Sequence, residues 1–96
     1  MYLKIHKSGN QMIVAVCDRE LIGKKLKKGE LVVEITESFY KGEIAPEEKI
    51  IEAIANATTS NIFGKRAVQC AVDAGLIDPG CIIYIEGIPH AQLYRL

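Results

Sequence analysis

The chain has 96 residues and a mass of 10.6 kDa, which is enough for a single domain over residues 1–96. Its 49% of apolar residues excludes intrinsic disorder, and its twelve basic and twelve acidic side chains leave no net charge to favour nucleic acid. The longest apolar runs are too short to span a membrane, and the N-terminus lacks the features of a signal peptide. We therefore expect a cytoplasmic protein with no membrane partner.

The N-terminal residues predict a β-hairpin. Residues 2–6 alternate between polar and apolar side chains, which is the period of a half-buried strand. Residues 11–17 form a nearly continuous apolar run, as expected of a central strand that is covered on both faces. The four residues 7–10 are typical of a turn and are expected to form the loop of the hairpin.

A short helix and a third strand are predicted after the hairpin. Asp18 is a suitable N-cap for one or two helical turns over residues 19–22, and Gly23 suits the left-handed conformation that ends them. Residues 28–30 have the composition of a turn. The β-branched residues of 31–36 then predict the third strand.

Two amphipathic helices are predicted in the second half of the chain. An ordered loop is expected at residues 39–42, followed by a helix over 46–57 with proline at its first position. The polar residues after this helix break it, and Ser60 or Asn61 is expected to cap the second helix. Gly75 is expected to end that second helix with a Schellman motif.

The C-terminal residues predict a turn at 78–80, a fourth strand over 81–86, a bend at 87–89 and a short edge strand over 93–96. This order predicts an α+β fold: a mixed sheet of four to five strands with an N-terminal hairpin and two main helices on one face. Nine residues are predicted to be buried: Val14, Val16, Val33, Ile50, Ile54, Val68, Ala71, Val72 and Ile83.

The cysteines and histidines do not have the spacing of a metal site. Cys17, Cys70 and Cys81 lie far apart, and neither His6 nor His90 has a nearby second ligand. We read the cysteines as structural and predict neither a metal, a cofactor nor a disulfide. A nucleophilic Cys17 is the less favoured alternative, because the neighbouring acidic residue opposes a low thiol pKa.

One run of lysines stands out. Lys24, Lys25, Lys27 and Lys28 surround a single leucine. The run is either a solvated turn or a small patch that contacts phosphate. Without aromatic neighbours it cannot read bases, so such a contact would be blind to sequence.

A second basic segment opens the predicted helix after residue 60. Asn61 is a candidate cap, Gly64 permits a close approach to the backbone, and Lys65 and Arg66 add positive charge. The segment lacks the glycine and hydroxyl positions of a Walker A loop, so nucleotide hydrolysis of that type is rejected. Plain helix capping and contact with an anion, including an RNA backbone, both stay open.

The C-terminal polar residues offer a third candidate. His90 titrates near neutral pH, and Gln92 lies two residues further along, so an extended chain places both on one side. Either they satisfy backbone groups of the bend, or they contact a ligand or partner. We expect Asn61, Gly64, Lys65, His90 and Gln92 to share one surface.

Five blocks of the sequence, at residues 1–7, 17–24, 37–43, 57–68 and 87–92, together resemble one family. Its most specific elements are Phe-Tyr-x-Gly-Glu and Pro-His-Ala-Gln. On these motifs the chain resembles the small archaeal proteins of the domain of unknown function 424 family, over essentially its whole length. The resemblance implies an archaeal cytoplasmic protein of one domain, without implying a reaction or a ligand. It marks seven positions as candidate surface: Phe39, Tyr40, Gly42, Asn61, Gly64, His90 and Gln92.

Two functional hypotheses remain. The first is a small non-catalytic binding module with an RNA or protein partner, associated with the translation machinery. Its candidate phosphate contacts are the four lysines of 24–28, and its candidate partner contacts include Lys65 and Arg66. The second is a small-molecule enzyme that uses His90 as general acid or base, although no recognisable catalytic partner accompanies that residue.

Overall fold

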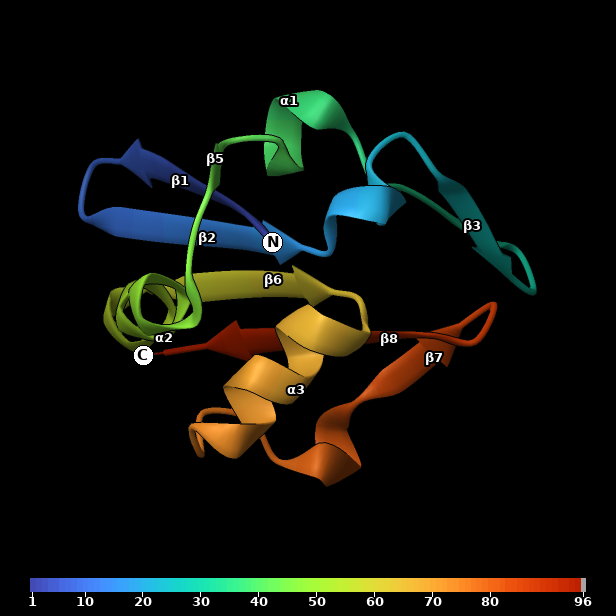
Figure 1. Cartoon of the computed structure of the whole chain (residues 1–96). Helices are drawn as coiled ribbons and strands as arrows, with labels where there is room; N and C mark the ends of the chain where they lie inside the picture. The colour runs from blue at the N-terminus through green and yellow to red at the C-terminus, as the bar shows by residue number, and fades with distance from the viewer. Residues whose placement is uncertain (96) are drawn as a thin grey trace.

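The computed structural model, which describes residues 1–95, has the predicted α+β fold with a larger sheet than expected. A mixed six-stranded sheet has the order β5-β1-β2-β6-β8-β7, and a separate two-stranded ribbon projects from one end of it (Figure 1). The strands of the main sheet are β5 (Glu43–Ile44), β1 (Tyr2–Ser8), β2 (Gln11–Cys17), β6 (Thr59–Phe63), β8 (Ile88–Tyr94) and β7 (Ile83–Ile85).

The N-terminal hairpin is confirmed with a shorter loop. Strand β2 spans the predicted residues, and β1 extends to Ser8, which pairs with Gln11. Only Gly9 and Asn10 form the turn, so the four-residue loop was wrong. The positive φ of +59° at Gly9 explains why glycine suits this two-residue turn.

Strand β6 lies where a helix cap was predicted. It pairs in parallel with β2 and antiparallel with β8, which places it in the middle of the sheet. Ser60 and Asn61 therefore belong to a strand, and the interpretation of either residue as a helix cap was wrong. These polar residues are typical of caps when they are considered locally, but here pairing on both sides determines their conformation.

Strand β8 runs from Ile88 to Tyr94, so the bend predicted at 87–89 was wrong beyond Gly87. Leu93 and Tyr94 are in a strand as predicted and pair with β6 alone, but they are the end of β8 and not a separate strand. Residue 96 of the predicted edge strand lies outside the described residues. The turn lies at Glu86 and Gly87, whose positive φ values of 52° and 77° fit a two-residue hairpin loop. Pro89 lies opposite Gly64, and its carbonyl accepts from the Gly64 N–H at 2.9 Å. The Gly64 carbonyl, which an N–H at position 89 would face, already accepts from the Val68 N–H in the next helix. No strand partner therefore needs the missing proline amide.

The two predicted helices are confirmed, and both cover one face of the sheet (Figure 1). They are α2 (Glu47–Asn56) and α3 (Lys65–Asp73), and Pro46 precedes α2 by one residue. The predicted Schellman end of α3 is present, with Gly75 N–H donating to Val72 O at 2.9 Å and Leu76 N–H donating to Ala71 O at 3.0 Å.

Short elements cover the opposite face. They are the helix α1 (Glu37–Tyr40), a 3-10 helix at Arg19–Leu21, and the ribbon of β3 (Lys25–Lys28) and β4 (Leu31–Glu34). The expected loop at 39–42 is thus partly helical, and the third strand belongs to the ribbon rather than to the main sheet. Its partner β3 was missed because three of its four residues are lysines and only Leu26 is buried.

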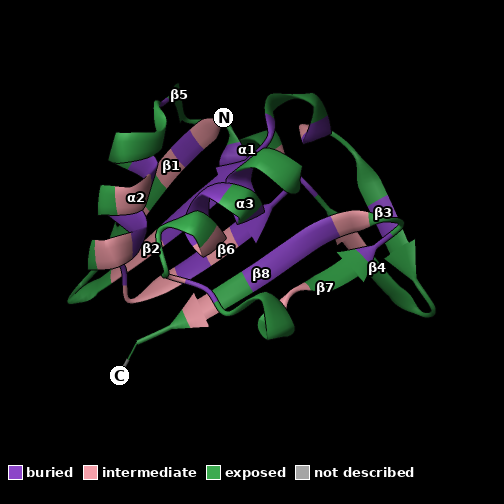
Figure 2. Cartoon of the chain, turned by 60° about the horizontal axis from the view of Figure 1, so that its bottom comes forward, coloured by how far each residue is buried: buried purple, intermediate pink, exposed green. Residues whose placement is uncertain are grey.

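Burial follows this two-sided arrangement, with buried residues concentrated on the inner strands (Figure 2). Six of the nine predicted core residues are fully buried, but Val33 and Val72 are half-buried and Ile83 is 43% exposed because it lies on the edge strand β7. Cys17 and Cys70 are buried as expected, whereas Cys81 is exposed. No helix within residues 1–95 has the length and apolar character needed to cross a membrane.

Candidate functional site

The candidate site lies where the two parallel strands end. Strand β2 ends at Cys17 beside Phe63, the last residue of β6, and the chain then enters the 3-10 helix on one side and α3 on the other. The carboxyl ends of adjacent parallel strands are where open α/β sheets place ligands, because the chain diverges there. Three of the blocks that carry the family resemblance, 17–24, 57–68 and 87–92, meet at this end of the sheet.

Asp18 holds this junction together from the interior. Its carboxylate is 4% exposed and accepts from the N–H groups of Arg66 at 3.1 Å and Ala67 at 2.9 Å. Asp18 makes no side-chain cap of its own 3-10 helix, so it caps α3, 48 and 49 residues away. A negative charge at a helix N-terminus is favourable, and the protein therefore supplies its own anion to these amides.

Gly64 is required by that contact. Its φ of +110° is a conformation that side chains rarely adopt, and a Cβ at this position would overlap the Asp18 carboxylate. Close approach of an internal carboxylate thus explains the glycine. The helix amides of Arg66 and Ala67 that seemed free to bind an external anion are already occupied.

Aromatic side chains form a continuous line from β1 to β8. His6 stacks on Phe39 with centroids 4.7 Å apart, and Phe39 meets Tyr40 edge to face at 4.9 Å. Tyr40 then meets Phe63 at 5.9 Å, and Phe63 stacks on His90 at 3.9 Å. The Phe-Tyr element of α1 and the Pro-His element of β8 are therefore joined through Phe63.

His90 is a structural part of this line. Its side chain is 9% exposed, and Nδ1 donates to the Ile62 carbonyl at 2.9 Å. Burial lowers the pKa of His90, while the hydrogen bond to Ile62 opposes the shift. Its ring satisfies a backbone carbonyl of the neighbouring strand β6 and not of the predicted bend.

Two other buried titratable groups lie at the junction. Burial, with the charge of Asp18 next in importance, raises the pKa of Cys17 to about 12. Burial also raises the pKa of Tyr40, and Cys17 contributes to that rise. Near neutral pH both groups keep their protons, so they pack as neutral side chains.

The structure brings most of the five residues expected on one surface close together, but Gly64 and His90 are buried and so do not belong to a surface. Asn61 pairs with Gln92 across β6 and β8, and the Gln92 Nε2 donates to the Asn61 Oδ1 at 2.8 Å. Gly64 bonds directly to Pro89, the neighbour of His90. Gly42 lies apart from this group, since its α-carbon packs so tightly on β1 that a Cβ would overlap the Leu3 carbonyl.

A pocket of about 230 Å³ opens on the surface of the junction, beside the start of α3. Lys24 and Lys65 line it, and Glu20 is its one exposed acidic residue. Gly64, Gly87 and Pro89 are among the other residues that line it. Lys25, Lys27 and Lys28 lie further out on β3, all exposed.

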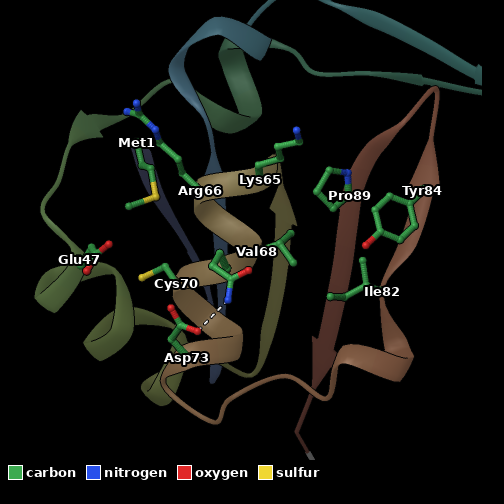
Figure 3. A pocket seen from close by; sticks show the side chains of 11 residues that line it. Met1, Glu47, Lys65, Arg66, Val68, Cys70, Asp73, Ile82, Tyr84 and Pro89 are labelled. Atoms are coloured by element: carbon green, nitrogen blue, oxygen red, sulfur yellow. Dashed lines mark hydrogen bonds between the residues drawn. The ribbon is translucent and has the colours of Figure 1, made fainter.

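A larger pocket of about 760 Å³ runs along both sides of α3 (Figure 3). Arg66, Cys70, Asp73, Met1 and Glu47 line the side toward α2, and Lys65, Val68, Ile82, Tyr84 and Pro89 line the side toward β7. Sequence analysis missed Ile82 and Tyr84. Their alternation in an apolar run is a signal for one shared sheet face, but it does not indicate that the face is uncovered.

Comparisons with known proteins agree with the resemblance found in the sequence. The family model described as a protein of unknown function, DUF424, matches residues 6–96. The chain belongs to this family. A solved structure, described as an uncharacterized conserved protein from Methanopyrus kandleri, is 33% identical, with a TM-score of 0.83 over 97% of this chain and 89% of that one. Among curated proteins no match is found.

Proposed function

We propose that this DUF424 protein is a non-catalytic binding module that contacts the phosphate backbone of RNA through its basic end. The observation that carries the proposal is the meeting of Lys24 and Lys65 at one pocket, although 41 positions separate them in the sequence. Two lysine ammonium groups at one pocket form a site suited to a phosphate group.

The distribution of charge supports this proposal despite the net charge of zero. Seven basic residues gather at the end with the ribbon and the start of α3: Arg19, Lys24, Lys25, Lys27, Lys28, Lys65 and Arg66. Acidic residues there are Glu20, Glu30, Glu34 and Glu86, while Asp18 is committed to helix amides. Two further glutamates of α2, Glu48 and Glu52, lie away from this end, in a pocket with Met12, whereas Glu47 lines the larger pocket with Arg66.

The ribbon favours a polymer over a single anion. Lys25 and Lys27 point to the same face of β3, and residues two apart in a strand are about 7 Å apart. That spacing is on the scale of successive phosphates along a nucleic-acid strand. Because these contacts involve phosphates rather than base edges, binding should be independent of base sequence.

The enzyme alternative has less support. A general acid or base needs access to the proton that it transfers. The His90 ring is buried, stacked on Phe63 and bonded through Nδ1 to Ile62. We therefore keep the binding module as the conclusion.

The test is the salt dependence of RNA binding, measured by fluorescence anisotropy with a labelled single-stranded oligonucleotide of mixed sequence. Replacement of Lys24 and Lys65 by glutamine should reduce the slope of log K against log salt by about 1.4, because each phosphate that is no longer neutralised lowers it by about 0.7. Two unrelated oligonucleotide sequences should bind equally well.

Lys7→Gln with Lys49→Gln is the control, since it removes the same charge from exposed positions outside the small pocket, although it also removes the ion pair of Lys49 with Glu43. This pair should leave the slope unchanged and, like the Lys24 and Lys65 pair, should change the free energy of unfolding by no more than about 0.5 kcal/mol for each substitution. Equal loss of affinity in both pairs, or no RNA binding at about 50 mM salt, would refute the proposal.

A further inference from the structure

The two edges of the main sheet differ in how they are protected. Strand β5 has only two residues, and its Glu43 forms an ion pair with Lys49 at 2.8 Å. Strand β7, at the other edge, is Ile-Tyr-Ile without a charged side chain. Charged residues normally protect an edge strand from pairing with another chain, so β7 lacks this protection.

The register determines which backbone groups face the free edge. Pairs in an antiparallel ladder alternate between hydrogen-bonded and non-hydrogen-bonded positions, and Ile85 opposite Ile88 closes the two-residue turn. Tyr84, opposite Pro89, is therefore at a non-hydrogen-bonded position. The Pro89 carbonyl confirms this assignment because it bonds Gly64 on the other side of β8. The Tyr84 N–H and C=O thus point outward, and within residues 1–95 no strand pairs with β7 on that side.

An apolar groove lies beside this edge. Ile82 and Tyr84 form its outer side, Pro89 its floor and Val68 of α3 its inner wall (Figure 3). Tyr84 is 58% exposed although it lies in the sheet. A strand added to β7 would place alternate side chains beside Tyr84, along the outer side of this groove, as in other cases of recognition by strand addition.

The two ends of the groove differ in charge. Lys65 lines it and also lines the small pocket together with Gly87 of the β7–β8 turn, so the charge of Lys65 belongs to the turn end of the groove. At the far end of α3, Asp73 accepts from Gln69 at 2.7 Å. A segment with an acidic group at the turn end would match this polarity.

We propose that β7 and the groove beside α3 bind an extended apolar peptide segment of a partner protein, with an acidic residue near Lys65. A second copy of this chain is a poorer occupant. Pairing of two three-residue strands would bury far less than the roughly 1,200 Å² of a stable interface.

The experiment uses a random peptide library that is panned against the folded full chain, and the strongest binder is titrated into isotope-labelled protein. We expect selected peptides to alternate apolar residues and to carry an acidic residue, and their binding to shift the resonances of Ile82, Tyr84 and Val68. Failure to recover a binder, or shifts confined to other surfaces, would overturn the proposal.

Two variants test the backbone pairing itself. Tyr84→Pro removes the outward N–H, whereas Tyr84→Ala removes the ring and keeps the N–H. Proline is compatible with an edge strand when its nitrogen faces solvent, so both variants should fold. Tyr84→Pro should weaken the selected peptide about tenfold more than Tyr84→Ala, as expected when a backbone hydrogen bond is removed. Equal affinities would contradict strand addition.

A measurement on the unmodified chain tests the proposal even if the proline variant does not fold. Bound peptide should slow hydrogen exchange of the Tyr84 amide at least about tenfold, because that amide gains a hydrogen-bond partner. An unchanged rate would argue against the proposal. A dimer detected by light scattering and abolished by Tyr84→Pro would assign the edge to a second copy instead. RNA affinity should be the same in Tyr84→Pro and Tyr84→Ala, because the backbone of β7 takes no part in the proposed RNA contact, although Lys65 lines both pockets.

Discussion

The two faces of the main sheet are covered in different ways. One face is covered by α2 and α3, whose apolar residues repeat at helical spacing. The other is covered by α1, a 3-10 helix and the ribbon, none of which has more than four residues in one element. Contacts of Phe63 with Tyr40 and His90 hold this second face together. The packing of the first face therefore depends on apolar residues at helical spacing, whereas the packing of the second depends on a few large side chains.

The largest expected effect is on the second face. Phe63 is 1% exposed and contacts both Tyr40 and His90, so Phe63→Ala should lower the free energy of unfolding by about 3–5 kcal/mol. Ile54 lies on the buried side of α2, and Ile54→Ala should lower the free energy of unfolding by about 2–5 kcal/mol. Urea denaturation followed by circular dichroism measures both losses. A loss below about 1 kcal/mol for Phe63→Ala would mean that the aromatic line adds little to stability.

The junction between the faces gives the next effect. Gly64→Ala forces a side chain into a conformation that is essentially restricted to glycine and against Asp18, so it should cost at least about 1–3 kcal/mol. Gly75→Ala is the matched control because its φ is +73° but nothing lies within 4 Å of the added Cβ. Its cost should be only about 1 kcal/mol. Equal losses in urea denaturation would show that φ alone, and not the Asp18 contact, requires glycine at 64.

The parts of the fold that were predicted correctly have local signals. The hairpin, α2 and α3 each combine a clear period with residues that stop the element, as at Gly75. Strand β6 has no such signal, since its Thr-Ser-Asn start is typical of a helix cap. Its conformation depends on β2 and β8, which are distant in sequence, so no local pattern could have revealed it.

The candidate site was predictable in part for the same reason. Gly64 stood out because glycine in a first helical turn is costly, and Gln92 and His90 stood out because they alternate along a strand. The group that approaches Gly64 is Asp18, which lies 46 positions earlier. Sequence analysis assigned Asp18 to its own short helix, because a cap that acts across the fold is not recognisable from spacing.

The smallest of the three effects is the pH dependence of the free energy of unfolding, which we attribute to His90 on the aromatic face. Burial holds the pKa of His90 below its usual 6.5. Below about pH 6.5, His90 therefore binds a proton more readily in the unfolded chain than in the folded chain. Stability should therefore fall as the pH drops from about 7 to 5. His90→Asn keeps a donor for Ile62 without titrating, and subtracting its profile removes the contributions of all other groups. The difference between wild type and His90→Asn should decrease toward acid, and a constant difference would mean that His90 titrates alike in both states.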